Sequence, residues 1–216
     1  IDGASPILEN CVFQFSNNDG LWIKNGSPAI IQPVIQNNKG FAARIYPNAF
    51  PQIRNAVAVT NRFNAILIAG GSWTGSGEWV EPGIPYLIAE DVEIAPDARI
   101  AFAKGNTIQF NYISSDLIVR GRLDAIGSDT LPILFTSSQL VPWRGTWGAL
   151  VFAPGSSGHI SQANVEYGGS NFASEGVESQ FRLQAGAEVT LENLTLRDSL
   201  NYGMIVEATA ATLTNL

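Results

Sequence analysis

Short apolar segments recur along the chain at a spacing of about 22 residues. Leu191-Glu192-Asn193-Leu194 returns as Leu213-Thr214-Asn215-Leu216, so the leucine and the asparagine both recur after 22 positions. A unit of this size is too small to bury its own apolar face, and it must stack on its neighbours. The pattern therefore predicts a solenoid with coils of about 22 residues.

The first third of the chain repeats the same unit, beginning at Pro6, Pro28 and Pro51. Each unit runs from proline through an apolar pair, an amide and an apolar residue to a turn and a short apolar strand. The turn residues Gly20, Gly40 and Asn64 are types that can adopt positive φ. The amides are Asn10, Gln32 and Asn55, matched in the last coils by Asn193 and Asn215. We expect the amides to form a stacked structural ladder along the solenoid.

Apolar residues at the repeat period are expected to face the core. They are Val12, Val34, Val57, Leu191, Leu194 and Leu213. Apolar and polar residues alternate in Glu188-Val189-Thr190-Leu191, which is typical of short strands. Strands about 4.8 Å apart in roughly nine coils would make a rod about 40 Å long. The single cysteine, Cys11, can form no intrachain disulfide, and we expect it to be buried as a small hydrophobe.

A segment rich in glycine and tryptophan interrupts the repeat. It includes Gly70-Gly71-Ser72-Trp73 and Gly77-Glu78-Trp79. We interpret residues 1–70 as solenoid coils, 71–86 as a junction or a long loop, and 87–216 as coils that continue or restart the solenoid. A leucine-rich repeat is the rival fold, because Leu191-x-x-Leu194-x-Leu196 fits its opening. That match occurs once, and the other coils are rich in Val, Ile and Thr.

A series of motifs from Trp79 to Gly169 carries a family resemblance. The motifs are Pro85-Tyr86 ahead of Asp91-Val92, then Val119-x-Gly121-x-Leu123-x-Ala125-x-Gly127, Pro132-Ile133-Leu134-Phe135-Thr136, Trp147-Gly148-Ala149-Leu150-Val151-Phe152 and Val165-Glu166-Tyr167-Gly168-Gly169. In this order they resemble secreted bacterial right-handed parallel β-helix repeat proteins of the pectate-lyase-like superfamily. The chain departs from that pattern at Asp97, where a glycine usually follows the proline. The resemblance implies an all-β, right-handed parallel β-helix, a fold on which many members are surface or adhesive modules.

Composition narrows the range of partners and locations. The chain is 45% hydrophobic and 14% charged, with 21 Gly and 11 Pro, as in a folded, turn-rich β protein. The net charge of -7 disfavours nucleic acid and anionic membranes as partners. The sequence contains no stretch of transmembrane length and no signal peptide, and we expect no direct membrane insertion. We expect an extracellular or cell-surface protein, and we interpret the start at Ile1 as a processed or excised piece of a longer product.

Chemistry on such a fold would require clustered carboxylates, either to hold calcium or to act as acid and base. Glu90, Asp91, Glu93 and Asp97 are the candidate metal ligands, with a solvated acidic turn as the alternative; calcium is the one cofactor considered. Arg120 and Arg122 lie near Asp124, where ion pairing between coils explains them as well as catalysis does. His159, the single histidine, has no partner that the sequence identifies. No catalytic residue is therefore assigned.

The tryptophans are the stronger candidates for ligand binding. Trp73 and Trp79 lie in the interruption, and Trp143 precedes Arg144 in a loop. Exposed indoles could stack on sugar rings, whereas the alternative is that they cover an end or a flank of the solenoid. Trp147 belongs to the fold signature.

Two functional hypotheses follow. The favoured one is a non-catalytic extracellular structural or adhesive module. Its partners would be flanking β-helix coils of a longer surface protein or other copies of itself, stacked head-to-tail into a fibre, because both terminal coils lack a cap. The alternative is a carbohydrate-binding or polysaccharide-degrading β-helix, that is, a lyase or a hydrolase.

Overall fold

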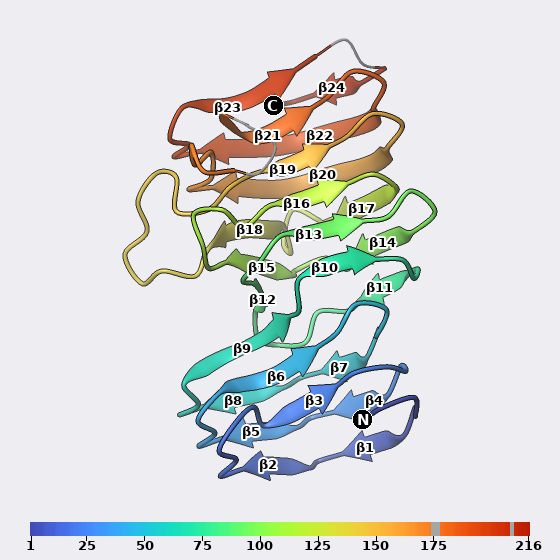
Figure 1. The fold of residues 1–216 in the computed structure, drawn as a ribbon, viewed down its shortest axis with the longest axis vertical. Helices are drawn as coiled ribbons and strands as arrows, with labels where there is room; N and C mark the ends of the chain where they lie inside the picture. The colour runs from blue at the N-terminus through green and yellow to red at the C-terminus, as the bar shows by residue number, and fades with distance from the viewer. Residues whose placement is uncertain (174–177, 208–209) are drawn as a thin grey trace.

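The computed structural model describes residues 1–173, 178–207 and 210–216. Within these residues the chain forms short β-strands and no helix, and the strands of successive coils pair in parallel. Figure 1 shows the coils stacked along one long axis, with the N-terminus in the coils at one end and the C-terminus at the other. The chain is a parallel β-helix, which confirms the fold class expected from the repeat.

The first three coils contain three strands each, arranged in three rows. Two of these rows end with the third coil. The first is β1 (Ile7–Glu9), β4 (Ala29–Ile31) and β7 (Gln52–Arg54), and the second is β2 (Val12–Gln14), β5 (Val34–Gln36) and β8 (Val57–Val59). Ile7 pairs with Ala29, 22 residues later, as the repeat predicted.

The third row continues along the molecule. It contains β3 (Leu21–Ile23), β6 (Phe41–Ile45), β9 (Phe63–Ile68), β12 (Tyr86–Ile88), β15 (Thr107–Phe110) and β18 (Ile133–Ser137), followed by the long strands β20 (Ser157–Glu166) and β22 (Glu188–Arg197). β12 pairs with β9 on one side and with β15 on the other. Figure 1 shows the row turning at β12, where the first coils meet the later ones.

Two new rows begin in the segment that interrupts the repeat. One is β10 (Gly71–Trp73), β13 (Val92–Ile94), β16 (Leu117–Val119), β19 (Leu150–Phe152), β21 (Ser179–Leu183) and β23 (Tyr202–Val206). The other is β11 (Gly77–Trp79), β14 (Arg99–Phe102) and β17 (Arg122–Ile126), then β20, β22 and β24 (Thr212–Thr214). Residues 71–79 of the interrupting segment thus form the two short strands β10 and β11.

Several coils bend at a residue in the left-handed region. Asn10, Gln32 and Asn55 have φ of 52°, 53° and 53°, and Gln162, Asn193 and Asn215 have φ of 49°, 53° and 53°. Asparagine tolerates this conformation better than other non-glycine residues, because its short polar side chain bonds locally. The amides expected to form a ladder are therefore corner residues. Asn215 Nδ2 does donate to Asn193 Oδ1 at 3.0 Å, whereas Asn10 and Gln32 donate through backbone N to the neighbouring coil.

A buried amide ladder occurs at a different corner of the first coils. Asn38 Nδ2 donates to Asn61 Oδ1 at 2.8 Å, and both side chains also donate to backbone carbonyls of the preceding coil. Gly20 packs against this ladder, since a Cβ there would lie 2.5 Å from Asn38 Nδ2. Gly20, Gly40 and Asn64 do not have positive φ, contrary to expectation. Gly20 and Gly40 instead allow close packing between coils, because neither has a side chain. Asn64 accepts a hydrogen bond from the Asn61 side chain.

The valines of the second row point outward, whereas the sequence predicted that they face the core. Val12, Val34 and Val57 pair with one another in register, so their recurrence is real. However, Val12 and Val57 are 55% and 50% exposed. The middle residue of each strand is less exposed: Ile35 is buried, and Phe13 and Ala58 are half-buried. In a strand, a shift of one residue exchanges the two faces. Valine recurs here because a β-branched residue suits a strand on either face.

The predicted core positions of the last coils are mostly correct. Leu191 and Leu194 are buried. Leu213 pairs with Leu191 but is partly exposed, because β24 pairs with β22 alone in the described part of the chain. Cys11 is half-buried and its Sγ contacts the Glu9 carbonyl at 3.5 Å, so its complete burial was a wrong expectation.

Substitutions in the second row test the corrected face. Ile35→Ala should lower the free energy of unfolding by about 2–5 kcal/mol, because it leaves a cavity in a closely packed core. Val57→Ala, one strand away on the outer face, should change it by less than about 0.5 kcal/mol. Urea denaturation of the two variants measures both values. Equal effects would contradict the assignment of the faces.

Candidate functional site

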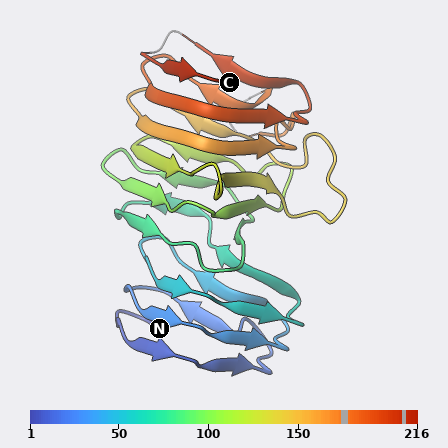
Figure 2. The same ribbon diagram turned by 180° about the vertical axis from the view of Figure 1, so that it is seen from behind.

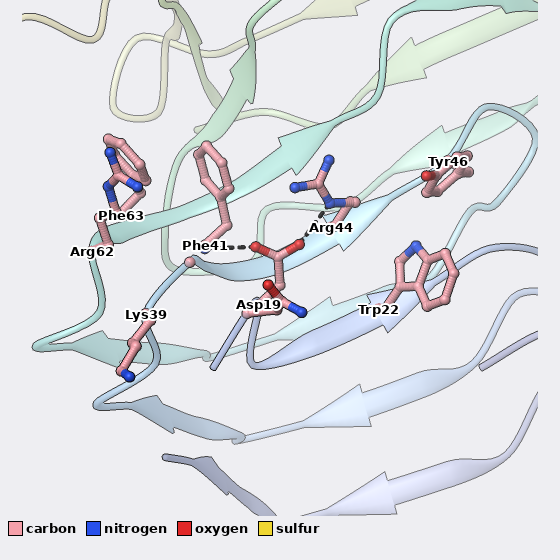
Figure 3. A pocket seen from close by; sticks show the side chains of 10 residues that line it. Asp19, Trp22, Lys39, Phe41, Arg44, Tyr46, Arg62 and Phe63 are labelled. Carbon is pink, nitrogen blue, oxygen red and sulfur yellow. Dashed lines mark hydrogen bonds and ion pairs between the residues drawn. The ribbon is translucent and has the colours of Figure 1, made fainter. Parts of the chain in front are cut away.

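A shallow pocket of about 530 Å³ lies on the outer face of β3, β6 and β9 (Figure 3). Three neighbouring coils contribute to it, and most of its lining is aromatic or cationic. The lining residues are Asn18, Asp19, Trp22, Lys39, Gly40, Phe41, Arg44, Tyr46, Arg62 and Phe63.

Strand alternation directs these side chains outward. Leu21 and Ile23 enter the core, so Trp22 between them faces solvent and is 51% exposed. Trp22 pairs in register with Arg44, which lies directly above it in the row. The register shifts between Phe41 and Ala43, as at a β-bulge. Bulges redirect side chains, and this one lies beside the pocket.

The aromatic rings form two pairs on opposite sides of the pocket. Phe41 and Phe63 stack with ring centroids 4.6 Å apart and an interplanar angle of 18°. Trp22 and Tyr46 lie 5.9 Å apart with their planes inclined by 59°. Figure 3 shows Arg44 and Asp19 between the two pairs. The pocket therefore offers two aromatic surfaces separated by a polar centre.

Asp19 organises the polar centre. Its Oδ2 accepts a bond from Arg44 Nε at 2.6 Å, and its Oδ1 accepts one from the Phe41 backbone N at 2.8 Å. Gly40 permits this approach, since a Cβ on it would lie 2.4 Å from Asp19 Oδ1. The bond to Nε uses one of the five N–H groups of the Arg44 guanidinium.

The pocket carries positive charge on an acidic protein. Lys39, Arg44 and Arg62 contribute three positive charges and Asp19 one negative charge, so the lining is +2 while the whole chain is -7. The Arg62 guanidinium lies 5.3 Å from the Phe63 ring centroid and that of Arg44 lies 5.9 Å from the Phe41 ring, which are cation–π distances. Such a pocket can stack flat groups and donate hydrogen bonds to oxygen atoms.

Two of the predicted ligand-binding tryptophans are core residues. Trp73 and Trp79 end β10 and β11 with their side chains inward, and both are buried. Their ring centroids lie 4.4 Å apart, and Trp79 also packs against Tyr86 and Phe102. The prediction failed because a glycine-rich segment was interpreted as exposed, whereas its glycines lead into strands. Burial raises the pKa of the Tyr86 hydroxyl well above its ordinary value, and the negative charge on Glu81 adds to the rise.

The other predicted pair is exposed but lies outside the pocket. Trp143 is 58% exposed in the loop between β18 and β19. Arg144 forms a long ion pair of 3.6 Å with Asp198. The structure therefore does not bring Trp143 and Arg144 together with Trp73 and Trp79.

The four candidate metal ligands are also separate. Among the described residues, which include Glu90, Asp91, Glu93 and Asp97, no group of three or more His, Cys, Asp or Glu side chains is placed to hold a metal ion. Asp91 accepts a bond from the Asp116 backbone N, and Glu93 pairs with Arg120 of the next coil at 2.8 Å. The structure therefore does not bring these four carboxylates together, which favours the alternative of acidic residues in solvated turns and ion pairs.

The remaining charged candidates form ion pairs on the surface. Arg122 binds Asp124 of the same strand through two bonds of 2.7 and 2.8 Å. His159 Nε2 lies 3.1 Å from Glu192 Oε2 of the next coil, a partner that the sequence did not identify. These contacts agree with the interpretation that the charged residues form ion pairs within a strand and between coils.

The pocket residues were missed although the repeat contains a signal for them. Phe41 and Phe63 are 22 residues apart, as are Trp22 and Arg44, and Lys39 and Arg62 are 23 apart. Aligning the coils on their outward positions would have placed aromatic above aromatic and cation above cation.

Comparisons with known proteins add no assignment. Neither the protein-family models, nor the curated proteins, nor the solved structures contain a match to this chain. Within the described residues, no helix is long and apolar enough to span a membrane. The resemblance to pectate-lyase-like proteins therefore stays a prediction.

Fluorescence quenching tests the placement of the tryptophans. Trp22 and Trp143 are exposed while Trp73, Trp79 and Trp147 are buried. Iodide should therefore quench two of the five indoles, and the double variant Trp22→Phe/Trp143→Phe should lose nearly all of the accessible fraction. Strong quenching that persists in this variant would show that Trp73 or Trp79 reaches solvent.

Proposed function

We propose that this protein is a non-catalytic, extracellular β-helix module that adheres to carbohydrate through the pocket on β3, β6 and β9. The observation that carries the proposal is the arrangement of two aromatic pairs around Arg44 on neighbouring coils. A sugar ring has an apolar C–H face and a polar rim. The pocket complements both, with Trp22 and Tyr46 for the face and cationic donors for the rim.

The form of the pocket suits a polymer chain. It is shallow and open along the surface, so a saccharide could extend beyond it on either side without being enclosed. Its side chains project from strands of a stacked sheet, which hold a binding constellation more firmly than loops do. Positive charge within the lining favours sugars that carry carboxylate or sulfate groups.

The carboxylates do not support catalysis at this place. Glycoside hydrolysis requires two carboxyl groups that flank the scissile bond. The pocket has one, Asp19, and both of its oxygens are engaged, by Arg44 and by the Phe41 backbone. A binding role is therefore favoured over the alternative of a lyase or hydrolase.

Removal of the exposed indole tests the binding role. Trp22→Ala should weaken binding to the best ligand in a panel of acidic and neutral oligosaccharides by about tenfold or more, because an aromatic anchor is lost. Isothermal titration calorimetry measures the affinity. Tyr112→Ala is the control, since Tyr112 is also an exposed aromatic residue but lies outside the pocket. Equal losses in both variants, or no binding to any acidic or neutral saccharide, would contradict the proposal.

The absence of catalysis is tested separately. Incubation of the protein with acidic and neutral polysaccharides should release no reducing ends and no unsaturated products, with and without added calcium. Product release that Asp19→Asn abolishes would favour the enzymatic alternative.

A further inference from the structure

The aromatic and cationic groups of the pocket follow one another along β6. Phe41 begins this strand, Arg44 lies three positions later, and Tyr46 follows the last residue of the strand. At about 3.3 Å per residue, the backbones of Phe41 and Tyr46 lie about 16 Å apart. This length exceeds one sugar ring, so the pocket has room for neighbouring units of a saccharide chain.

A shift in strand pairing accounts for the presence of Phe41 and Arg44 on one face. Residues three positions apart point to opposite faces of a regular strand. The register of β6 and β9 shifts between Phe41 and Ala43, and both Phe41 and Arg44 line the pocket. An irregularity of this kind re-aims a side chain, here an aromatic ring toward a cation.

The direction of β6 is also the direction in which a saccharide chain would lie. Figures 1 and 2 show that the coils stack along the long axis of the molecule, whereas their strands run across it. Along the stack, the next outward neighbours of Arg44 are Leu67 and Leu87. Both leucines are buried, so they offer a sugar neither an exposed ring nor a donor. The groups that can contact a chain are therefore arranged along the strand.

Positive charge is unevenly distributed along this line. Figure 3 shows Lys39 and Arg62 at the end of the pocket near Phe63, Arg44 near the middle, and no charged side chain beside Trp22 at the other end. The Arg62 guanidinium lies over the Phe63 ring, 5.3 Å from its centroid. The lining is +2 and the whole chain is -7, so the rest of the molecule carries -9. An acidic chain is attracted to the pocket and repelled by the rest of the surface.

Asp19 orients the central cation. Its side chain is 13% exposed, and its two oxygens are engaged by Arg44 Nε and by the Phe41 backbone N. The N–H groups on the Nη atoms of Arg44 make no hydrogen bond to any residue that the structure describes. These are donors that a carboxylate or sulfate oxygen can accept from. The ion pair with Asp19 thus leaves Arg44 preorganised for an anionic group.

We propose that an acidic oligosaccharide lies along β6, with the apolar face of one unit on Trp22 and the carboxylate or sulfate group of the next unit on Arg44. Further units pass Phe63, and a second anionic group binds Arg62. Asp19 is a positioning residue, because it acts on the ligand through Arg44. This inference rests on the proposed function and adds the charge, the length and the direction of the ligand.

Calorimetric titration with two series of oligosaccharides tests charge and length. One series is alginate oligomers of about two to eight units, which carry a carboxylate on every unit, with their methyl esters as uncharged copies. The other is carrageenan oligomers, which carry sulfate, with desulfated copies. In at least one series the longer acidic oligomers should bind about tenfold or more tightly than the disaccharide and than their uncharged copies. The series that binds more tightly identifies the anionic group.

Three variants test the residues. Arg62→Gln should weaken binding of the longer acidic oligomers about fivefold or more and leave the disaccharide unaffected. Arg54→Gln is the matched control and should change nothing, since Arg54 is an exposed arginine of β7 outside the pocket. Asp19→Asn makes the lining more positive, so charge alone would strengthen binding. Loss of positioning should instead weaken the acidic oligomers about tenfold and leave the uncharged copies bound as before.

The contrary results separate this inference from the proposed function. Circular dichroism should show all variants folded. The inference fails if acidic and uncharged copies bind equally, if the disaccharide binds as tightly as longer oligomers, or if Arg54→Gln weakens binding as much as Arg62→Gln. Stronger binding by Asp19→Asn would also overturn it. In each of these cases a saccharide still binds and the proposed function survives; that function fails only if neither acidic nor uncharged oligosaccharides bind.

Discussion

The first and the last coils of the solenoid share one backbone conformation at a corner between two strand rows. Asn10, Gln32 and Asn55 adopt φ near 53° in the first coils, and Gln162, Asn193 and Asn215 do so in the later ones. This conformation turns the chain, either between two strands or within the long strands β20 and β22, and it recurs at paired positions of successive coils. Residues without a tolerant side chain pay about 1–2 kcal/mol there. The recurrence of amides at this point of the repeat is thus first a requirement of the backbone, and hydrogen bonding between stacked amides is secondary.

Once the corners are aligned, buried polar side chains of one coil can bond to the neighbouring coil. Asn38 and Asn61 do so, because each side chain bonds both to the adjacent amide and to a backbone carbonyl of the preceding coil. A leucine at either position would leave these backbone groups unsatisfied, at a cost of about 1–3 kcal/mol.

The junction between the first and the later coils keeps part of the stacking and exchanges the rest. Two rows end at β7 and β8 and two others begin at β10 and β11, while β12 keeps the third row continuous. The cluster of Trp73, Trp79 and Tyr86 fills the core where the rows are exchanged.

The period and the parallel fold could be predicted from the sequence, because a repeat of about 22 residues leaves few other ways to bury apolar surface. Which residues of the first strands face the core could not be predicted in the same way. Val12, Val34 and Val57 recur more visibly than the inward-facing residues beside them, Phe13, Ile35 and Ala58, which differ in size from coil to coil. Burial of Trp73 and Trp79 was equally hidden, since it depends on which row the glycine-rich segment joins. Ion pairs such as His159 with Glu192 connect residues far apart in sequence, and their pairing follows from coil register alone.

The outer face is where this fold has freedom to acquire function. Inside the solenoid, packing restricts each position to a side chain of suitable size and polarity, whereas an outward position such as Trp22 or Arg44 can change without disturbing the stack. Stacking nevertheless places outward residues of successive coils about 4.8 Å apart, so a few changes at one repeat position create a continuous surface. Phe41 and Phe63 became a stacked pair in this way, and Arg44 reached Asp19 across one coil boundary. A binding pocket on a β-helix therefore requires no departure from the repeat; it arises from the outward residues of three coils acting together.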